Sequence, residues 1–75
     1  MGRLAGYTYK TASKRLRDFG FVEYRPGKGS HQIWYNQATK LKTVIPKHPG
    51  DIPEGTMRAI LRQADIKPDE FLKHK

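Results

Sequence analysis

The side chains in this sequence that could transfer a proton or hold a metal are few. The chain has 75 residues, with histidines at positions 31, 48 and 74 and no cysteine. Without cysteine, the chain has no disulfide, no thiolate nucleophile and no thiolate zinc site. The histidines lack close metal-ligand spacing, so we expect no metal and no cofactor. What remains is imidazole, which titrates near neutral pH and serves as either base or acid.

His31 has the most suitable position for such a role. It follows the turn-forming run Pro26-Gly27-Lys28-Gly29 and lies at one end of an expected strand. There the strand ladder would hold its backbone while the side chain meets solvent. Gly29 and Ser30 are small, which would let a phosphate group approach the backbone closely. From spacing alone, a half-exposed strand histidine that pairs across the sheet is the more ordinary interpretation.

The charge balance limits the classes of partner. Lys and Arg total 15 against 7 Asp and Glu, so the formal net charge is +8. This excess favours a polyanionic partner, with nucleic acid first, an acidic protein second and an anionic membrane surface third. No apolar run approaches the length of a membrane span or resembles a secretory signal. We therefore expect a cytoplasmic protein with a single domain over residues 1–75.

Hydrophobic periodicity predicts the elements that would position His31. Residues 1–7 form a leader with little commitment to structure, and Thr8 is an expected N-cap for a helix that Gly20 ends. Strands are expected over 21–25, 30–36 and 41–45, with turns at 26–29 and 37–40. A second helix begins between residues 53 and 56, and residues 67–72 form one further helical turn. The apolar helix positions are Ala12, Leu16, Phe19, Met57, Ile60, Leu61 and Ala64.

This order predicts an α+β fold of the type α-β-β-β-α. Short turns between the strands favour a three-stranded antiparallel sheet. Neither helix has another apolar surface to bury against, so both are expected to cover the same sheet face. The other face is left to solvent or to a partner. On so small and basic a chain, this order resembles the double-stranded-RNA-binding fold.

Four local motifs make the resemblance narrower. They are Gly20-Phe21 after the first helix, Gly29-Ser30-His31 at the second strand, Pro46-Lys47-His48 after the third strand, and a pattern of residues in the second helix. That pattern runs from Gly55-Thr56-Met57 through Ile60-Leu61-Arg62-Gln63-Ala64. In this order and spacing, the motifs are similar to the HicA (YcfA-like) family of toxins, over about residues 8–72. The chain departs from the family at Asp65, where Gly is usual, and at Lys67, where Ser or Thr is frequent.

The resemblance implies a function for the histidine. HicA-like proteins are toxins of type II toxin–antitoxin systems, which cut messenger RNA and are neutralised by an antitoxin of the HicB type. The resemblance assigns the catalytic role to His31. RNA is cleaved without a metal when a base takes the proton of a ribose 2′-hydroxyl and that oxygen attacks the adjacent phosphorus. Two alternatives stay open at this point: an RNA-binding module without catalysis, and a basic protein that docks an acidic protein.

Further candidates surround His31 or lie on the first helix. An antiparallel register brings residue 31 opposite residue 45, 46 or 47, which would place His48 at the same sheet end as a candidate acid–base partner. Lys28, Lys47 and Ser30 flank that end and could contact phosphate. The solvent side of the first helix could lie along RNA phosphates, where contacts set affinity and salt dependence rather than sequence preference. Its basic residues are Lys10, Lys14, Arg15 and Arg17.

Two aromatic residues have alternative roles. Trp34 and Tyr24 have the same strand parity as Gln32 and Val22, opposite to His31 and Ile33. If the His31 face is the core, Trp34 and Tyr24 are exposed and could stack on an unpaired base or anchor an antitoxin. If the other face is the core, they are packing residues. The sequence alone does not choose between these arrangements.

Overall fold

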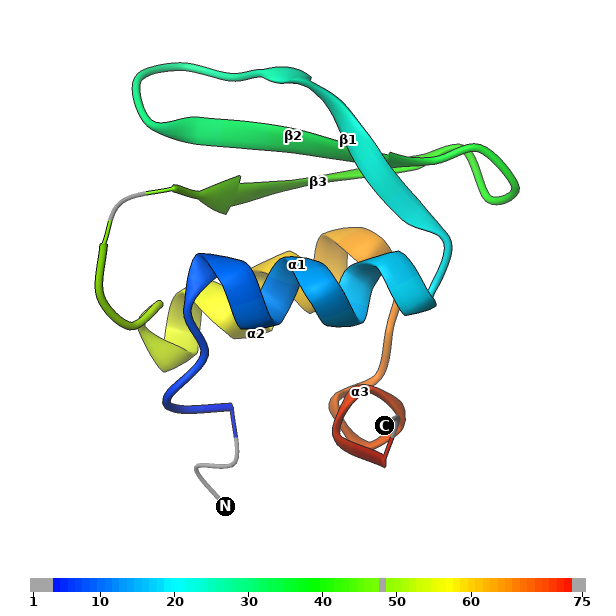
Figure 1. Ribbon diagram of the computed structural model, residues 1–75. Coiled ribbons are helices and arrows are strands. Elements are labelled where there is room, and N and C mark those ends of the chain that lie inside the picture. Colours follow the sequence, from blue (N-terminus) through cyan, green and yellow to red (C-terminus); the bar gives the residue numbers. More distant parts are fainter. Residues whose placement is uncertain (1–3, 48, 74–75) are drawn as a thin grey trace.

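The described part of the chain has six elements, in the order that the sequence predicted. The computed structural model describes residues 4–47 and 49–73. The predicted α+β order α-β-β-β-α is confirmed, and the expected turn after it is a third short helix (Figure 1). The elements are α1 (Tyr9–Asp18), β1 (Phe21–Pro26), β2 (His31–Asn36), β3 (Leu41–Pro46), α2 (Glu54–Ala64) and α3 (Pro68–Lys73).

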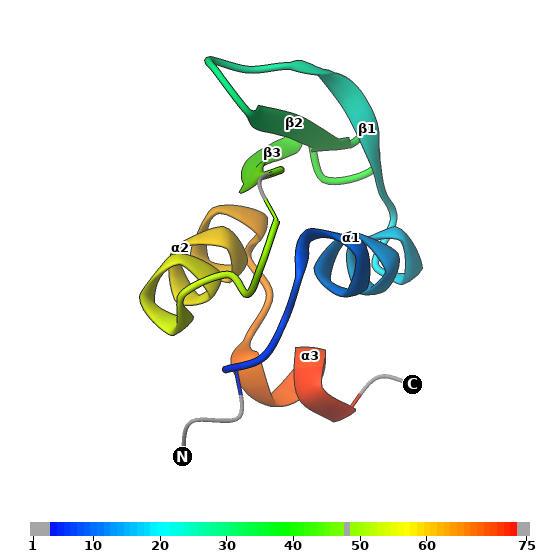
Figure 2. The ribbon, with the colours of Figure 1, turned by 60° about the vertical axis from the view of Figure 1, so that its left-hand side comes forward.

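The three strands form one antiparallel sheet in the order β1-β2-β3. His31 pairs with Pro46, within the register that the sequence predicted. Figures 1 and 2 show α1 and α2 lying on the same face of this sheet, as expected. In both views α3 lies on the far side of the two helices from the sheet. No described element covers the opposite sheet face, which we call the outer face.

Polar contacts hold both ends of α1, its start at Thr8 and the corner where it leads into β1. The Thr8 hydroxyl caps α1 by accepting from the backbone N–H of Thr11 at 3.3 Å, and the Thr11 hydroxyl accepts from Thr8 N–H at 2.9 Å. Gly20 has φ of +97°, and a Cβ there would lie 3.1 Å from Nδ2 of Asn36. That Nδ2 donates to the carbonyl of Phe19 at 3.0 Å. The predicted cap and the predicted helix stop are therefore both confirmed.

The core lies between the sheet and the two helices, with Trp34 at its centre. Trp34 is 0% exposed, and along β2 the buried residues Gln32, Trp34 and Asn36 alternate with more exposed ones. Tyr24 is 51% exposed and lies on the outer face, so the expectation that it shares a face with Trp34 is wrong. The physical reason is the hairpin register. Val22 pairs with Tyr35, so in the part of β1 before the register shift at Glu23/Arg25, even-numbered residues share a face with odd-numbered residues of β2.

The segment before α1 is more ordered than the sequence predicted. Leu4 is 1% exposed and belongs to the hydrophobic core. The backbone N–H of Ile52 donates to the carbonyl of Tyr7 at 2.6 Å, and Thr8 forms an isolated bridge with Asp51. The expectation of a loose leader is therefore wrong from residue 4 onward. The buried Leu4 side chain anchors this segment in the core, and the backbone contacts of Tyr7 and Thr8 connect it to the loop before α2.

The third helix docks on α1 through a partly buried cation. An Nη atom of Arg15 donates to the carbonyl of Phe71 at 2.7 Å, near the C-terminus of α3. The Arg15 guanidinium lies 5.9 Å from the ring centroid of Tyr7 and 5.7 Å from that of Phe71. A cation is favoured near helix-terminal carbonyls and over aromatic faces. Arg15 therefore holds α3 and the N-terminal segment together.

Asp65 ends α2 in a left-handed conformation. Its φ is 58° and its ψ is 41°. The N–H of Ile66 donates to the carbonyl of Leu61 at 2.9 Å, and the N–H of Asp65 donates to that of Arg62 at 3.2 Å. These two bonds form a Schellman motif, whose left-handed position is usually Gly. The aspartate carboxylate also lies at the negative end of the helix dipole.

We therefore predict that Asp65→Gly stabilises the protein. Removing the Cβ strain of the left-handed residue should raise the free energy of unfolding by about 1 kcal/mol, as measured by urea denaturation. Asp65→Asn is the matched control, because it removes the charge and keeps a side chain at the same backbone angles. If glycine is no more stable than asparagine, backbone strain at this position is not the cause.

Candidate active site

One end of the molecule gathers the β1–β2 turn, the end of β3 and the start of α1 (Figure 1). The N–H of Gly27 donates to the carbonyl of His31 at 2.8 Å and closes the turn. The N–H of Lys47 donates to the carbonyl of Ser30 at 2.6 Å, so the residue after β3 is paired to the residue before β2. The Lys47 ammonium lies 5.7 Å from the ring centroid of Tyr9, at the first residue of α1. These contacts connect the three segments.

His31 is exposed at this end, and its own turn holds its ring. The Lys28 carbonyl oxygen lies 3.0 Å from the backbone nitrogen of His31 and 2.9 Å from its Nδ1. A carbonyl oxygen has no hydrogen to give, so this ring contact is a hydrogen bond only when Nδ1 carries the proton. In the neutral ring, Nε2 then bears the lone pair. The local turn thus selects the tautomer in which Nε2 is a base.

The outer face carries this imidazole. Along β2, His31 alternates with the buried residues Gln32 and Trp34 and therefore projects away from the helices. Pro46 is directly opposite His31. Lys47 comes one residue later, and its contact with Tyr9 directs its ammonium toward α1 instead. His31 and Lys47 therefore lie at the same sheet end but extend toward opposite sides of the sheet.

The candidate phosphate contacts divide between this end and the length of α1. Lys28, Ser30 and Lys47 are exposed at the sheet end, as expected. Lys10 is exposed in the first turn of α1, next to Tyr9. Lys14 and Arg17 are also exposed but lie progressively further along the helix, with Arg17 about 10 Å beyond Lys10. The structure therefore brings four of the six candidates near one end and leaves two at a distance.

Two arginines of α1 have structural contacts that the sequence did not indicate. The Arg17 guanidinium lies 5.1 Å from the Trp34 ring centroid, and one of its nitrogens is 4.0 Å from a Glu23 oxygen. Arg15 is half-buried against Phe71, as described above. It was expected on the solvent side of α1, and its contacts with α3 contradict that. Apolar spacing placed Arg15 beside the stripe, but nothing in the sequence showed that α3 would cover it.

Tyr9 supplies a hydroxyl between α1 and the sheet. It donates to Oε2 of Glu23 at 3.4 Å, and its ring lies 6.4 Å from that of Trp34. Partial burial raises the pKa of Tyr9, and the Glu23 carboxylate acts in the same direction. The hydroxyl therefore remains a proton donor at neutral pH. Glu23 is held on the helix side by this contact and by Arg17.

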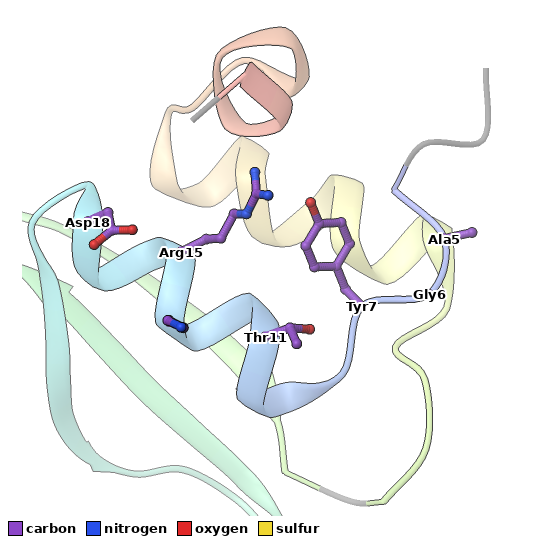
Figure 3. Close-up of a pocket in the computed structure, with 7 residues that line it drawn as sticks. Ala5, Gly6, Tyr7, Thr11, Arg15 and Asp18 are labelled. Carbon is purple, nitrogen blue, oxygen red and sulfur yellow. The ribbon is translucent and has the colours of Figure 1, made fainter. Parts of the chain in front are cut away.

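A separate pocket of about 510 Å³ lies on α1, against the N-terminal segment (Figure 3). Figure 3 shows Arg15 and Tyr7 extending toward one another at this pocket. Its remaining lining residues are Ala5, Gly6, Thr11, Lys14 and Asp18. Two of its lining residues, Arg15 and Tyr7, also take part in the contacts that dock α3. It contains none of the residues of the sheet end.

His31 is the one histidine among the described residues. His48 and His74 both lie outside the described residues, so the expected proximity of His48 to His31 remains a prediction. Among residues 4–47 and 49–73, no group of three or more His, Asp or Glu side chains is positioned to hold a metal ion. Within the same ranges, no helix has the length and apolar character needed to cross a membrane.

Sequence reasoning missed part of the outer face. Tyr35, Arg25 and Lys42 lie there with Tyr24, whose ring centroid is 5.3 Å from that of Tyr35. Arg25 pairs with Ile33 because the register shifts between Glu23 and Arg25. Alternation along β2 could have placed Tyr35 on the His31 face. The bulge that brings Tyr24 and Arg25 together has no clear signal in the sequence.

Comparison with known proteins assigns the chain to a family. A search of curated proteins finds no match. The family model described as "HicA toxin of bacterial toxin-antitoxin" matches residues 9–66. That match begins at the first residue of α1, passes through the turn and strand that carry His31, and ends just after α2. Since it covers most of the chain and agrees with the resemblance noted from the four motifs, this chain belongs to the HicA toxin family of bacterial toxin–antitoxin systems.

Proposed function

We propose that this toxin is a metal-independent endoribonuclease that cleaves messenger RNA in the cytoplasm, with His31 as its proton-transfer residue. The observation that supports this most strongly is the exposed imidazole whose Nδ1 is 2.9 Å from the Lys28 carbonyl. That contact leaves Nε2 with a lone pair at the solvent-facing end of the sheet. Histidine is the commonest side chain in general acid–base catalysis, and such proton transfer contributes about 10²–10⁴-fold in rate.

In the proposed reaction, Nε2 of His31 takes the proton from a ribose 2′-hydroxyl. The 2′-oxygen forms a bond to the adjacent phosphorus, and the bond from phosphorus to the 5′-oxygen breaks. The leaving 5′-oxygen receives a proton, so the products are a 2′,3′-cyclic phosphate and a 5′-hydroxyl. The Lys28 carbonyl orients the ring and strengthens its bond to Nδ1–H once the ring is cationic. His48 is a candidate for the acid that protonates the 5′-oxygen.

Positive groups near the sheet end would bind the phosphate as charge builds on its oxygens. Lys28 comes from the turn before His31, and Ser30 offers a hydroxyl next to it. Lys47, whose ammonium is directed toward Tyr9 of α1, would contact a neighbouring phosphate of the same RNA. Figure 1 shows that α1 and α2 both begin at this same end. Their N-termini carry partial positive charge and add to the local field. Lys10, Lys14 and Arg17 would extend the contact along α1.

The partner that neutralises the toxin is proposed to be a HicB-like antitoxin. The formal charge of +8 favours an antitoxin whose contact surface is acidic. Covering the His31 end would block both the imidazole and the lysines beside it. This inhibition would not require any change in the fold of the toxin.

His31→Ala tests the proposed base. Because alanine removes the group that accepts the 2′-hydroxyl proton, we expect cleavage of a labelled RNA to fall by about 10²–10⁴-fold while RNA affinity stays within a few-fold. Gln37→Ala, an exposed change in the turn between β2 and β3, is the matched control and should keep full activity. An RNA with deoxyribose at the cut position should bind without being cut. Unchanged cleavage by the alanine variant would show that another residue is the base, and a wild-type chain that only binds RNA would be a binding module.

Chelation tests the absence of metal from the reaction. Since the proposed nucleophile belongs to the RNA and the proposed base is an imidazole, excess EDTA should leave the cleavage rate unchanged. The 5′ fragment should end in a 2′,3′-cyclic phosphate, which mass spectrometry distinguishes from a linear phosphate. Loss of activity in EDTA with recovery in magnesium would contradict the proton-transfer mechanism.

Salt dependence tests the proposed phosphate contacts. In the His31→Ala background, Lys10→Ala and Lys47→Ala should each reduce the slope of log affinity against log salt concentration by about one, because each removes a phosphate contact. Lys67→Ala is the matched control, since it removes the same charge beyond the C-terminus of α2. Equal slopes for all three variants would show that the end of the sheet does not bind phosphate.

A further inference from the structure

The outer face of the sheet is an uncovered surface with an unusual concentration of exposed apolar groups. Val22 is 56% exposed and Tyr24 is 51% exposed, and both belong to β1. Tyr35 lies directly opposite Val22, and its ring centroid is 5.3 Å from that of Tyr24 with an interplanar angle of 38°. Half-buried Ile33 and Val44 pair with each other beside them. An apolar and aromatic patch therefore crosses all three strands.

Two cations border the tyrosine pair. The guanidinium carbon of Arg25 lies 5.6 Å from the Tyr24 ring centroid, and Nζ of Lys42 lies 5.1 Å from it. These cations come from the two edge strands, β1 and β3, and meet over one ring. Tyr24 and the two cations are exposed. A surface of this kind offers π faces and positive charge at the same point.

The described strands place no acidic side chain on this surface. Within the three described strands, Glu23 is the one acidic residue. Its carboxylate lies on the helix side, where it contacts Tyr9 and Arg17. Electrostatic complementarity therefore favours a polyanion on the outer face.

The β-bulge in β1 produces this arrangement. The pairs Val22–Tyr35 and Arg25–Ile33 are separated by two residues on β1 but by one residue on β2. Glu23 pairs with Trp34 on the core side, and Tyr24 is the extra residue. Regular pairing would place Tyr24 opposite Ile33, whereas the bulge lets both Tyr24 and Arg25 project outward. Bulges frequently redirect side chains in this way next to functional sites.

The same face carries His31, and this relation favours one occupant. His31, Ile33 and Tyr35 alternate outward along β2, so the imidazole and the tyrosine pair are about 13 Å apart along one strand. A short run of nucleotides spans such a distance. Base–aromatic stacking needs unpaired bases, because a duplex keeps its π faces inside its own stack. Phosphates between stacked bases would meet Arg25 and Lys42.

We infer that Tyr24 and Tyr35, with Arg25 and Lys42, form a stacking platform for single-stranded RNA next to the position where His31 acts. This inference deepens the proposed function and rests on it for the location of the cut. The platform binds bases without reading their identity, since every base has a π face. It restricts the substrate to unpaired stretches of RNA, although the fold resembles one that binds duplexes.

Binding measurements with leucine variants test the platform. In the His31→Ala background, the probe is a fluorescein-labelled unstructured oligoribonucleotide, alone and annealed to its complement. Tyr24→Leu and Tyr35→Leu should each weaken single-strand binding by about 5- to 150-fold, because each removes one base–aromatic stack. Duplex binding should change less than twofold. Tyr24→Phe keeps the π face and should retain wild-type affinity, and Val22→Ala is a matched exposed control on the same face.

The outcomes separate the platform from the nuclease. Thermal unfolding checks that each variant folds. Because Tyr24 is exposed, Tyr24→Leu is the variant less expected to disturb the fold. Equal single-strand affinity in wild type and both leucine variants overturns the platform and leaves the face to a protein partner. Equal losses for single-strand and duplex probes overturn it as well. If the wild-type protein, with His31 intact, does not cut RNA but Tyr24→Leu still loses single-strand affinity, the platform is supported and the proposed nuclease activity is contradicted.

Discussion

The structure depends on the strict alternation of side chains along β2. Trp34 is completely buried, and its neighbours Gln32 and Asn36 face the same core. Because successive side chains of a strand point to opposite faces, burying Trp34 forces His31 and Tyr35 outward. A slip of one residue would bury the imidazole and expose the indole. The hydrophobic core thus determines which side of the sheet is available for chemistry.

Polar contacts at both ends of β2 help to fix the register on which this alternation depends. At one end, the Lys28 carbonyl binds both the backbone and the ring of His31. At the other end, the Asn36 amide donates to the Phe19 carbonyl, and its oxygen accepts from the N–H of Ala38 at 2.9 Å. The strand is therefore fixed in register at both ends as well as in the middle. A small protein with few buried residues gains rigidity at a surface site in this way, without a deep cleft.

Most of the fold could be predicted from the sequence, because local signals agreed with the global arrangement. Thr8, Gly20 and the apolar spacing of both helices indicate the elements, and the short turns indicate their antiparallel order. The packing of Leu4 and Arg15 could not be predicted, since both depend on contacts between segments far apart in the chain. The position of His31 at the sheet end followed from its place after a turn. The bulge beside Tyr24 did not, because an extra residue in a strand leaves the hydrophobic pattern almost unchanged.

The distribution of charge shows why net charge alone does not define an RNA-binding surface. Arg15 is half-buried and contacts the end of α3, so this cation contributes to packing within the protein. Arg25 and Lys42, which the sequence did not indicate as candidate contacts, lie against the exposed ring of Tyr24 on the same face as His31. Opposite roles for similar side chains follow from which face of which element they occupy. The register of the sheet therefore determines the proposed path of the RNA. The formal charge of +8 only indicates that the partner is a polyanion.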